Sequence, residues 1–208
     1  LTIPNLNTEI RKRFPKQTKD KSAIKVLFLN MSGYYSSGSD SQERVLMEPP
    51  LGLIALQSYL NRELKEKFLG KIVKSRLDFD SNSEMVKIIE DFKPDIIGIS
   101  VMTFYKDFVH KAIDFIRESG VTTPIFLGGP YPTGDYENVL QDENIDLCML
   151  GEGEKTLTEL VKLMIKNDKK LPSQEALKEL PGIAFLEKPN FQSINIGKKG
   201  LVEKNLNL

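Results

Sequence analysis

The chain has 208 residues, 40% of them hydrophobic and 28% charged, and its 29 basic and 29 acidic residues leave no net charge. This balance argues against nucleic acid as the main partner, because phosphate binding favours a basic excess. A single cysteine excludes an internal disulfide and any iron–sulfur cluster held by this chain alone, and no apolar run approaches the roughly 18 residues of a membrane-spanning helix. We therefore expect a globular protein of the cytoplasm with neither a membrane nor a nucleic acid as partner.

The first third of the chain predicts a lead-in, a strand and a helix. Residues 1–23 are polar and basic and are expected to form a flexible lead-in, with contact between a basic arm and an anionic partner as the alternative. Residues 24–30 predict the first strand, and a loop rich in Ser, Gly and Tyr follows it. Pro49 and Pro50 then begin a helix, because proline is tolerated in a first helical turn. Its apolar face would contain Leu51, Ile54, Ala55, Leu56, Leu60 and Leu64.

The next two strands differ in their pattern. Residues 71–77 alternate apolar with charged side chains and predict an edge strand, whereas residues 95–101 are apolar on both faces and predict a central one. Between them, residues 80–83 offer several N-caps for a helix that Pro94 ends. The buried stripe of this helix would be Met85, Ile88, Ile89 and Phe92.

The second half continues the alternation of helices and strands. The pattern predicts a helix over 105–118, a strand over 124–127, a short helix near 136–140, a strand over 146–150 and a helix after Gly153. Such alternation indicates right-handed βαβ units. The expected fold class is α/β, with a flavodoxin-like (Rossmann-like), doubly wound parallel five-stranded sheet in the order 2-1-3-4-5.

This sheet domain is expected to span residues 24–170, and residues 171–208 are expected to add a β-hairpin and a linker. Residues 180–186 and 192–196 are the two hairpin strands, and the segment between them contains Pro189 and Asn190.

Two glycine turns are the most informative feature of the sequence. Gly128-Gly129-Pro130 and Gly151-Glu152-Gly153-Glu154 each follow a short apolar strand. Ligands of open parallel sheets bind at the carboxyl ends of the strands, and a residue without Cβ lets a ligand lie against the backbone. Two such turns on successive strands suggest a long ligand that crosses the sheet edge.

The loops at this edge carry no recognisable catalytic constellation. The only histidine, His110, lies within a predicted helix, where we interpret it as structural, and Cys148 is interpreted as a small buried hydrophobe. Asp78 and Asp80 follow the second strand, but no partner carboxylate is placed opposite them by the sequence. We therefore assign no catalytic residue and no metal ligand. An FMN phosphate loop at Met31–Ser39 remains an alternative, although Glu43–Pro50 separate it from the following helix.

Several motifs, in this order along residues 24–187, resemble the N-terminal cobalamin (B12)-binding domain of B12-dependent radical SAM enzymes. They are Glu48-Pro49-Pro50-Leu51-Gly52-Leu53, Pro94-Asp95-Ile96-Ile97-Gly98-Ile99-Ser100, Gly128-Gly129-Pro130, Gly151-Glu152-Gly153-Glu154 and Pro181-Gly182-Ile183. The resemblance implies a cobalamin with its corrin over the sheet edge and its nucleotide tail in a groove beside the third, fourth and fifth strands.

The resemblance also implies a set of cofactor-binding residues. An apolar floor, hydrogen-bonding hydroxyls, a bare backbone and helix-start amides would be supplied by Leu51, Gly52, Ser100, Met102, Thr103, Gly128, Gly129, Pro130, Tyr131, Gly151, Glu152 and Gly153. Aromatic loop residues could stack on the ligand or dock a further domain; they are Tyr34, Tyr35, Phe104, Tyr105 and Tyr131.

Two departures from cobalamin enzymes bear on this interpretation. The loop after the first strand lacks the Asp-x-His-x-x-Gly motif, so no lower axial cobalt ligand is assigned. The Cys-x-x-x-Cys-x-x-Cys motif that binds a 4Fe-4S cluster and S-adenosylmethionine is also absent, which indicates either a fragment or an orphan module. The expected function is a module, not catalytic alone, that presents cobalamin to a radical SAM domain in cis or trans for methyl transfer. A flavodoxin-like FMN or nucleotide-binding protein and a ligand-free interaction scaffold are the alternatives.

Overall fold

The computed structural model describes residue 18 and residues 20–36, 49–187 and 194–196. Most of the predicted lead-in, the middle of the loop after the first strand, the hairpin turn and the terminal linker lie outside these residues. Within the described residues the strands form one sheet in the order β2-β1-β3-β4-β5-β6-β7. The fold class and the strand order 2-1-3-4-5 predicted from the sequence are confirmed.

The parallel part of the sheet is short-stranded and largely buried. It comprises β1 (Ile24–Asn30), β2 (Phe68–Lys74), β3 (Ile96–Ser100), β4 (Ile125–Gly128) and β5 (Leu147–Met149). The first four residues of β3 are fully buried, as expected for a central strand, and β2 lies at the edge. A Cβ at Gly98 would lie 2.2 Å from the Phe126 ring, so glycine is required where this ring crosses β3.

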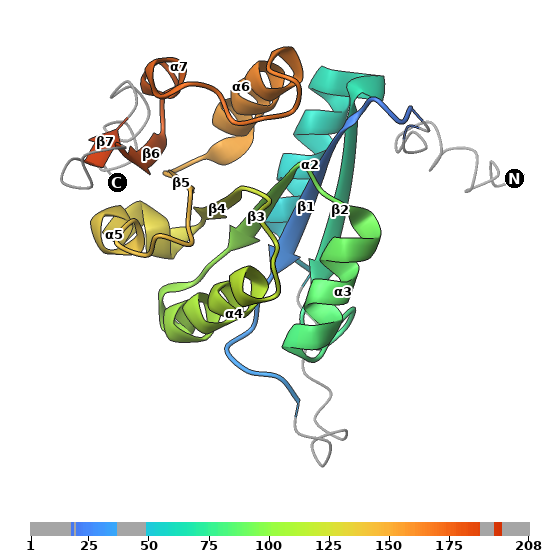
Figure 1. Cartoon of the computed structure of the whole chain (residues 1–208), viewed down its shortest axis with the longest axis vertical. Helices are drawn as coiled ribbons and strands as arrows, with labels where there is room; N and C mark the ends of the chain where they lie inside the picture. Colours follow the sequence, from blue (N-terminus) through green and yellow to red (C-terminus); the bar gives the residue numbers. More distant parts are fainter. Residues whose placement is uncertain (1–17, 19, 37–48, 188–193, 197–208) are drawn as a thin grey trace, which may run out of the picture.

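Helices cover both faces of this sheet (Figure 1). α3 (Asn82–Phe92), α4 (Lys106–Glu118) and α5 (Pro130–Val139) share one apolar core with it, and α2 (Leu51–Leu64), α6 (Gly153–Lys166) and α7 (Gln174–Lys178) share the other. Short 3-10 turns, η1 (Lys65–Lys67) and η2 (Thr103–Tyr105), precede β2 and α4. No helix in the described part of the chain combines the length and the apolar character that crossing a bilayer requires.

The predicted hairpin extends the sheet. β6 (Ile183–Leu186) pairs antiparallel with β5, and β7 (Ile194–Ile196) pairs antiparallel with β6. The hairpin is therefore part of the same sheet as the parallel strands.

Several element boundaries differ from the sequence prediction. β2 begins at Phe68, before the expected residue 71, and the end of its predicted range forms a turn in which Arg76 has φ +66°. α5 begins at Pro130 and not near residue 136, because Gly129 acts as its N-cap and a kink at Asp135 interrupts its periodicity. The short helix α7 was not predicted.

The buried face of α2 also differs from the prediction. Leu53, Leu60 and Leu64 are buried, whereas Leu51 and Ile54 are 69% and 39% exposed. Leu51 and Ile54, near the start of α2, therefore point to solvent at the carboxyl edge of the sheet, where they are available to a ligand or a partner.

Candidate functional site

The carboxyl ends of four parallel strands form one row across the sheet. The strand register aligns Lys74 of β2 with Asn30 of β1, Asn30 with Ser100 of β3, and Ser100 with Gly128 of β4. The predicted site residues Ser100 and Gly128 are therefore direct neighbours. Beyond this row lie the loops that a ligand at the sheet edge would contact.

The first glycine turn leaves the backbone of β4 uncovered. No other atom of the described residues lies within 4 Å of a Cβ built at Gly128. Gly129 has φ +102° and ψ −170°, a conformation that glycine alone adopts readily, and its Cβ would lie 3.0 Å from the Val101 carbonyl oxygen. Pro130 then occupies the first turn of α5 and is exposed. The turn thus combines Gly129, whose backbone conformation requires glycine, with Gly128, whose Cβ position is unoccupied by the described residues.

The second glycine turn is tied to the first by a hydrogen bond. Gly151, at φ +70°, donates its backbone N–H to Thr133 Oγ1 of α5 at 3.1 Å. Glu152, the N-cap of α6, is exposed and makes no side-chain cap hydrogen bond. A Cβ at Gly153 would lie 3.3 Å from Leu56 Cδ2 of α2, so this glycine permits close packing of α6 against α2.

The Pro181-Gly182-Ile183 motif is hydrogen-bonded to the residues on either side of the second glycine turn. The Leu150 N–H donates to the Gly182 carbonyl at 2.8 Å, and Thr156 Oγ1 donates to the Pro181 carbonyl at 2.7 Å. Gly182 has φ +73°, and its Cβ would lie 3.1 Å from both the Leu150 carbonyl oxygen and Thr156 Oγ1. The packing of this glycine explains its place in the motif without any ligand.

Apolar side chains at the edge are solvent-exposed in the protein alone. Leu51 starts α2, and a Cβ at Gly52 would meet no described atom within 4 Å. Met102 and Phe104, after β3, are 42% and 70% exposed. Exposed apolar groups from two elements at one edge form a surface that suits a large, flat ligand.

The hydroxyl groups of Ser100 and Thr103 lie at the same edge. Ser100 is half-buried at the end of β3, and Thr103 is exposed at the start of η2. Neither hydroxyl has a hydrogen-bond partner among the described residues. Both groups are therefore available to the amides or the phosphate of a ligand.

The described part of the loop after β1 is fixed to the loop after β2. Ser75, which is 1% exposed, accepts a hydrogen bond from the Ser32 N–H at 2.7 Å, and the two hydroxyls are 2.6 Å apart. Arg76 donates to Tyr34 Oη at 2.8 Å and places its guanidinium 4.4 Å from the centre of that ring. The Ser36 N–H donates to Asp80 at 2.8 Å.

Of the aromatic loop residues, Tyr34 and Phe104 are exposed, Tyr35 and Tyr105 are half-buried, and Tyr131 is 5% exposed. Tyr35 donates to Asn82 Oδ1 at 2.7 Å, and burial, followed by the charges of Asp80 and Glu84, raises the pKa of its hydroxyl to about 12. The Tyr105 ring covers Gly33, where an added Cβ would lie 2.6 Å from it. The Tyr131 ring is inside the molecule, which leaves little of it to stack on a ligand.

Sequence reasoning missed a polar cluster behind the first glycine turn. His110 Nδ1 of α4 lies 2.5 Å from Asp142 Oδ2, and its Nε2 lies 3.1 Å from Tyr131 Oη. It also missed Thr133, which joins the two turns. These partners are 18 to 32 residues apart in the sequence, so no local pattern could have indicated the pairs.

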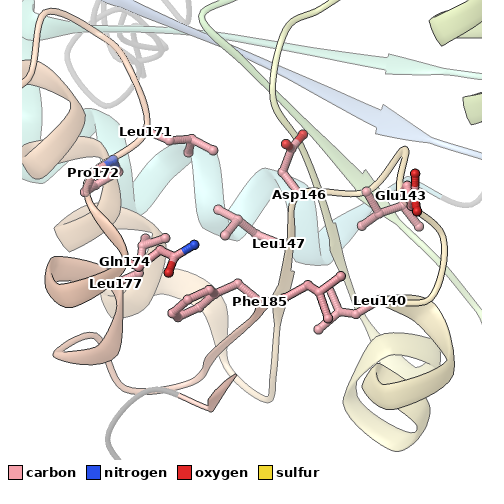
Figure 2. A pocket seen from close by; sticks show the side chains of 11 residues that line it. Leu140, Glu143, Asp146, Leu147, Leu171, Pro172, Gln174, Leu177 and Phe185 are labelled. Atoms are coloured by element: carbon pink, nitrogen blue, oxygen red, sulfur yellow. The ribbon is translucent and has the colours of Figure 1, made fainter. Parts of the chain in front are cut away.

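A separate cleft of about 250 Å³ lies away from the glycine turns (Figure 2). Its lining includes Asp146 and Leu147 at the start of β5, Phe185 and Leu186 toward the end of β6, and Leu177 of α7. Because the start of β5 and the end of β6 lie at the amino edge, this cleft is on the opposite side from the candidate site. Within the described residues, no group of three or more His, Cys, Asp or Glu side chains could hold a metal ion.

Comparison with known proteins identifies the family. The model of the B12 binding domain matches residues 43–161. An uncharacterised methyltransferase, PH0819, of Pyrococcus horikoshii is 29% identical over 140 residues, which are 67% of this chain and 28% of that protein. The cytidylyl-2-hydroxyethylphosphonate methyltransferase of Streptomyces wedmorensis is 35% identical over 80 residues, 36% of this chain and 14% of that enzyme. The chain thus spans less than a third of either relative.

Solved structures share the fold. The cobalamin-dependent S-adenosylmethionine radical enzyme OxsB, with aqua-cobalamin and S-adenosylmethionine bound, aligns with a TM-score of 0.62 at 21% identity over 86% of this chain and 23% of that one. The radical S-adenosylmethionine methyltransferase TsrM from Kitasatospora setae aligns with a TM-score of 0.63 at 16% identity over 86% of this chain and 31% of that one. The resemblance predicted from the sequence, with cobalamin as its cofactor, is confirmed by the family match, and the chain belongs to the B12-binding domain family.

Proposed function

We propose that this chain binds cobalamin at the carboxyl edge of its sheet and presents it to a radical SAM domain. The observation that carries the proposal is the open space over Gly128, beside Ser100, in the middle of the row of strand ends. A parallel sheet binds ligands at this edge, and here the protein's own described side chains leave the backbone bare. The residues present therefore fit a ligand with a long, narrow extension.

The residues divide between the two ends of cobalamin. The nucleotide tail would pass over Gly128 and Gly129, with the hydroxyls of Ser100 and Thr103 available to its polar groups. The backbone amides of Glu152 and Gly153, at the start of α6, would meet oxygen atoms of the tail, because a helix start favours anionic or acceptor groups, whereas the Gly151 N–H already donates to Thr133. The first glycine turn is half-buried, so it would orient the tail and shield it from water.

The corrin would lie on the exposed apolar surface. Leu51 and Gly52 of α2 and Met102 after β3 would contact the ring, and burial of Leu51 and Met102 would contribute about 25 cal/mol per Å² of apolar surface covered. When bound, cobalamin supplies a cobalt centre that can carry and transfer a methyl group. The chain's own part is to bind, orient and shield the cofactor.

We propose methyl transfer as the reaction in which the module takes part. Two relatives are named methyltransferases, and two structures that share the fold are radical S-adenosylmethionine enzymes. The 4Fe-4S cluster and S-adenosylmethionine would be held by the radical SAM domain, in cis or in trans. In this proposal residues 24–170 are the cofactor domain, residues 171–208 lead toward the catalytic domain, and the protein acts in the cytoplasm.

Retention of cobalamin after desalting tests the proposal. Protein mixed with hydroxocobalamin should keep the red colour of the cofactor. Gly128→Phe should lose it, because the ring would fill the space left for the tail while the backbone of this glycine has no positive φ. Glu118→Phe is the matched control: it adds the same ring at an exposed position at the far end of α4 and should retain the colour. A folded but colourless wild-type protein would count against the proposal.

The flavin alternative receives less support from the described loop. The Ser32 hydroxyl is engaged with Ser75 and with the Tyr34 carbonyl, and the Ser36 hydroxyl accepts from Arg76 at 3.2 Å. An FMN phosphate would need such hydroxyls to be available. The same desalting experiment with FMN should leave the protein without yellow colour or flavin fluorescence.

A further inference from the structure

The polar cluster behind the first glycine turn links α4 to both ends of α5 through side-chain hydrogen bonds. Tyr131 is the second residue of α5, His110 lies in the middle of α4, and Asp142 follows α5. The side chains of His110 and Asp142 are only 24% and 16% exposed. The cluster therefore connects both ends of α5 to α4 through one imidazole.

The donor and acceptor pattern of this cluster follows from its chemistry. An ionised carboxylate only accepts, so the Nδ1–H of His110 donates to Asp142, and Nε2 is left to accept the proton of the Tyr131 hydroxyl. Burial raises the pKa of Tyr131, and the charges of Asp135 and Asp107 raise it further, so the hydroxyl keeps its proton and remains a donor. Each group in the chain of hydrogen bonds thus has a partner that matches it.

Tyr131 transmits this anchoring to the glycine turn through its backbone. Its N–H donates to the Val101 carbonyl at 3.2 Å, and the Val101 N–H donates to the Gly128 carbonyl at 2.9 Å. The Val101 carbonyl is also the atom that a Cβ at Gly129 would approach to 3.0 Å. A shift of Tyr131 would therefore move both glycines of the turn.

We propose that His110, Asp142 and Tyr131 form a positioning network that holds the Gly128–Gly129 turn in the shape required by the nucleotide tail of a corrinoid. The inference rests on the proposed function for its ligand and on the hydrogen bonds above for its mechanism. None of these side chains contacts the tail; they act through the backbone of the turn. His110, which no local sequence pattern places at the site, is thereby connected to it.

Tyr131→Phe tests the network, because it removes one oxygen and keeps the buried ring. Tyr136→Phe is the matched control on the same helix, since the only hydrogen-bond partner of that hydroxyl among the described residues is the adjacent Glu137, at 3.4 Å. The probes are hydroxocobalamin, which has the nucleotide tail, and dicyanocobinamide, which lacks it. Loss of one hydrogen bond should raise the Kd of Tyr131→Phe for hydroxocobalamin about 3- to 10-fold and leave its Kd for cobinamide within about twofold of the wild type.

A merely structural role predicts a different result. Equal weakening of both corrinoids, or no weakening of either, would overturn the positioning role. Asp142→Asn should bind nearly as well as the wild type, because the amide oxygen can still accept from Nδ1–H.

Amide hydrogen exchange provides a readout without any cofactor. In Tyr131→Phe the amides of residues 101 and 131 should exchange about 3- to 10-fold faster, while that of Ile125, at the start of β4, should be unchanged. Because His110 is the only histidine in the chain, its ring signals can be followed by NMR without assignment, and saturating hydroxocobalamin should shift them more in the wild type than in Tyr131→Phe. If the wild type binds no corrinoid, the proposed function fails, and unchanged exchange in Tyr131→Phe would separately overturn the network.

Discussion

Three glycine-to-alanine substitutions can separate backbone strain from steric conflict at the first glycine turn. Gly129 has both problems: its φ is +102°, and an added Cβ would lie 3.0 Å from the oxygen and 3.3 Å from the nitrogen of Val101. Gly120, after α4, has φ +85° but open space, and Gly128 has open space and no positive φ. The three positions therefore form a graded series in one protein.

The expected magnitudes follow from these geometries. Gly129→Ala should cost about 2–4 kcal/mol, from about 1–3 for the backbone and a further contribution from crowding against a residue that is fully buried and cannot move aside. Gly120→Ala should cost about 1 kcal/mol, and Gly128→Ala should stay within about 0.5 kcal/mol of the wild type. For a chain of this length, each kcal/mol corresponds to about 2–4 °C in Tm.

Thermal unfolding followed by circular dichroism gives the comparison directly. Gly129→Ala should melt about 4–16 °C below the wild type, Gly120→Ala about 2–4 °C below it, and Gly128→Ala within about 2 °C. Gly128→Ala should behave differently in hydroxocobalamin binding. It should fold as stably as the wild type yet bind the cofactor more weakly than the wild type does. Equal losses of stability in all three variants would refute the reasoning. They would mean that neither the positive φ nor the short Cβ contact determines the cost of the added methyl group.

Four further predictions concern stability and the second turn. Folding raises the pKa of Tyr35 and of the buried Cys148 thiol to about 12 each, from ordinary values of 10.0 and 9.0. The unfolded chain therefore releases these protons first, and the free energy of unfolding should fall as pH rises from about 9 toward 12. Urea titrations at several pH values should show a shallower fall for Tyr35→Phe. Arg117 donates to the carbonyls of residues 121, 123 and 144 and to Asp146. Arg117→Ala should therefore lower the unfolding free energy by about 2–4 kcal/mol in urea titrations. The folded variant should keep its cobalamin affinity, because this cluster lies at the opposite edge of the sheet from the glycine turns. Ser81→Ala removes the N-cap acceptor of α3 and should cost about 1 kcal/mol in the same assay, with an unchanged value as the contrary result. Thr133→Val should cost about 0.5–1.5 kcal/mol and weaken cobalamin binding, whereas Thr133→Ser, which keeps the acceptor for Gly151, should do neither.

The sheet was predictable because its central strands carry unambiguous patterns. Residues 96–99 are apolar without interruption and bounded by Pro94 and a polar end, so β3 could only be a buried strand. Alternation with helices then fixed the parallel order. The boundaries that failed are those decided by contacts between distant residues: Phe68 and Leu69 extend β2 because they pair with Ile24 and Lys25 of β1, which no local periodicity indicates.

The orientation of α2 could not be predicted for a related reason. Leu51 and Ile54 fit one helical stripe and Leu53 lies outside it, so only the docking of the helix on the sheet decides that Leu53 faces inward. A helix of 14 residues with apolar side chains on several faces is compatible with more than one orientation. The two side chains left in solvent then become part of the candidate surface.

The glycine turns were predictable and their supports were not. Gly129 and Gly151 have positive φ, a backbone requirement that is visible in the sequence as glycine after a strand, and Gly182 has it in the turn before β6. The hydroxyl of Thr133 and the imidazole of His110 act on partners in other elements, and their role depends on the packing of α4 against α5. Which of the predicted residues touch the cofactor stays a prediction until binding is measured.

The antiparallel hairpin of β6 and β7 determines toward which edge of the sheet the last described strand runs. α6 travels from the carboxyl edge toward the amino edge, residues 167–182 return the chain to the carboxyl edge, and β6 then runs antiparallel to β5 toward the amino edge. β7 reverses again: Ile194 pairs with Leu186 and Ile196 pairs with Ala184, so β7 runs toward the carboxyl edge. The last described strand therefore points toward the carboxyl edge, the side of the sheet that carries the proposed cofactor site, and not toward the amino edge.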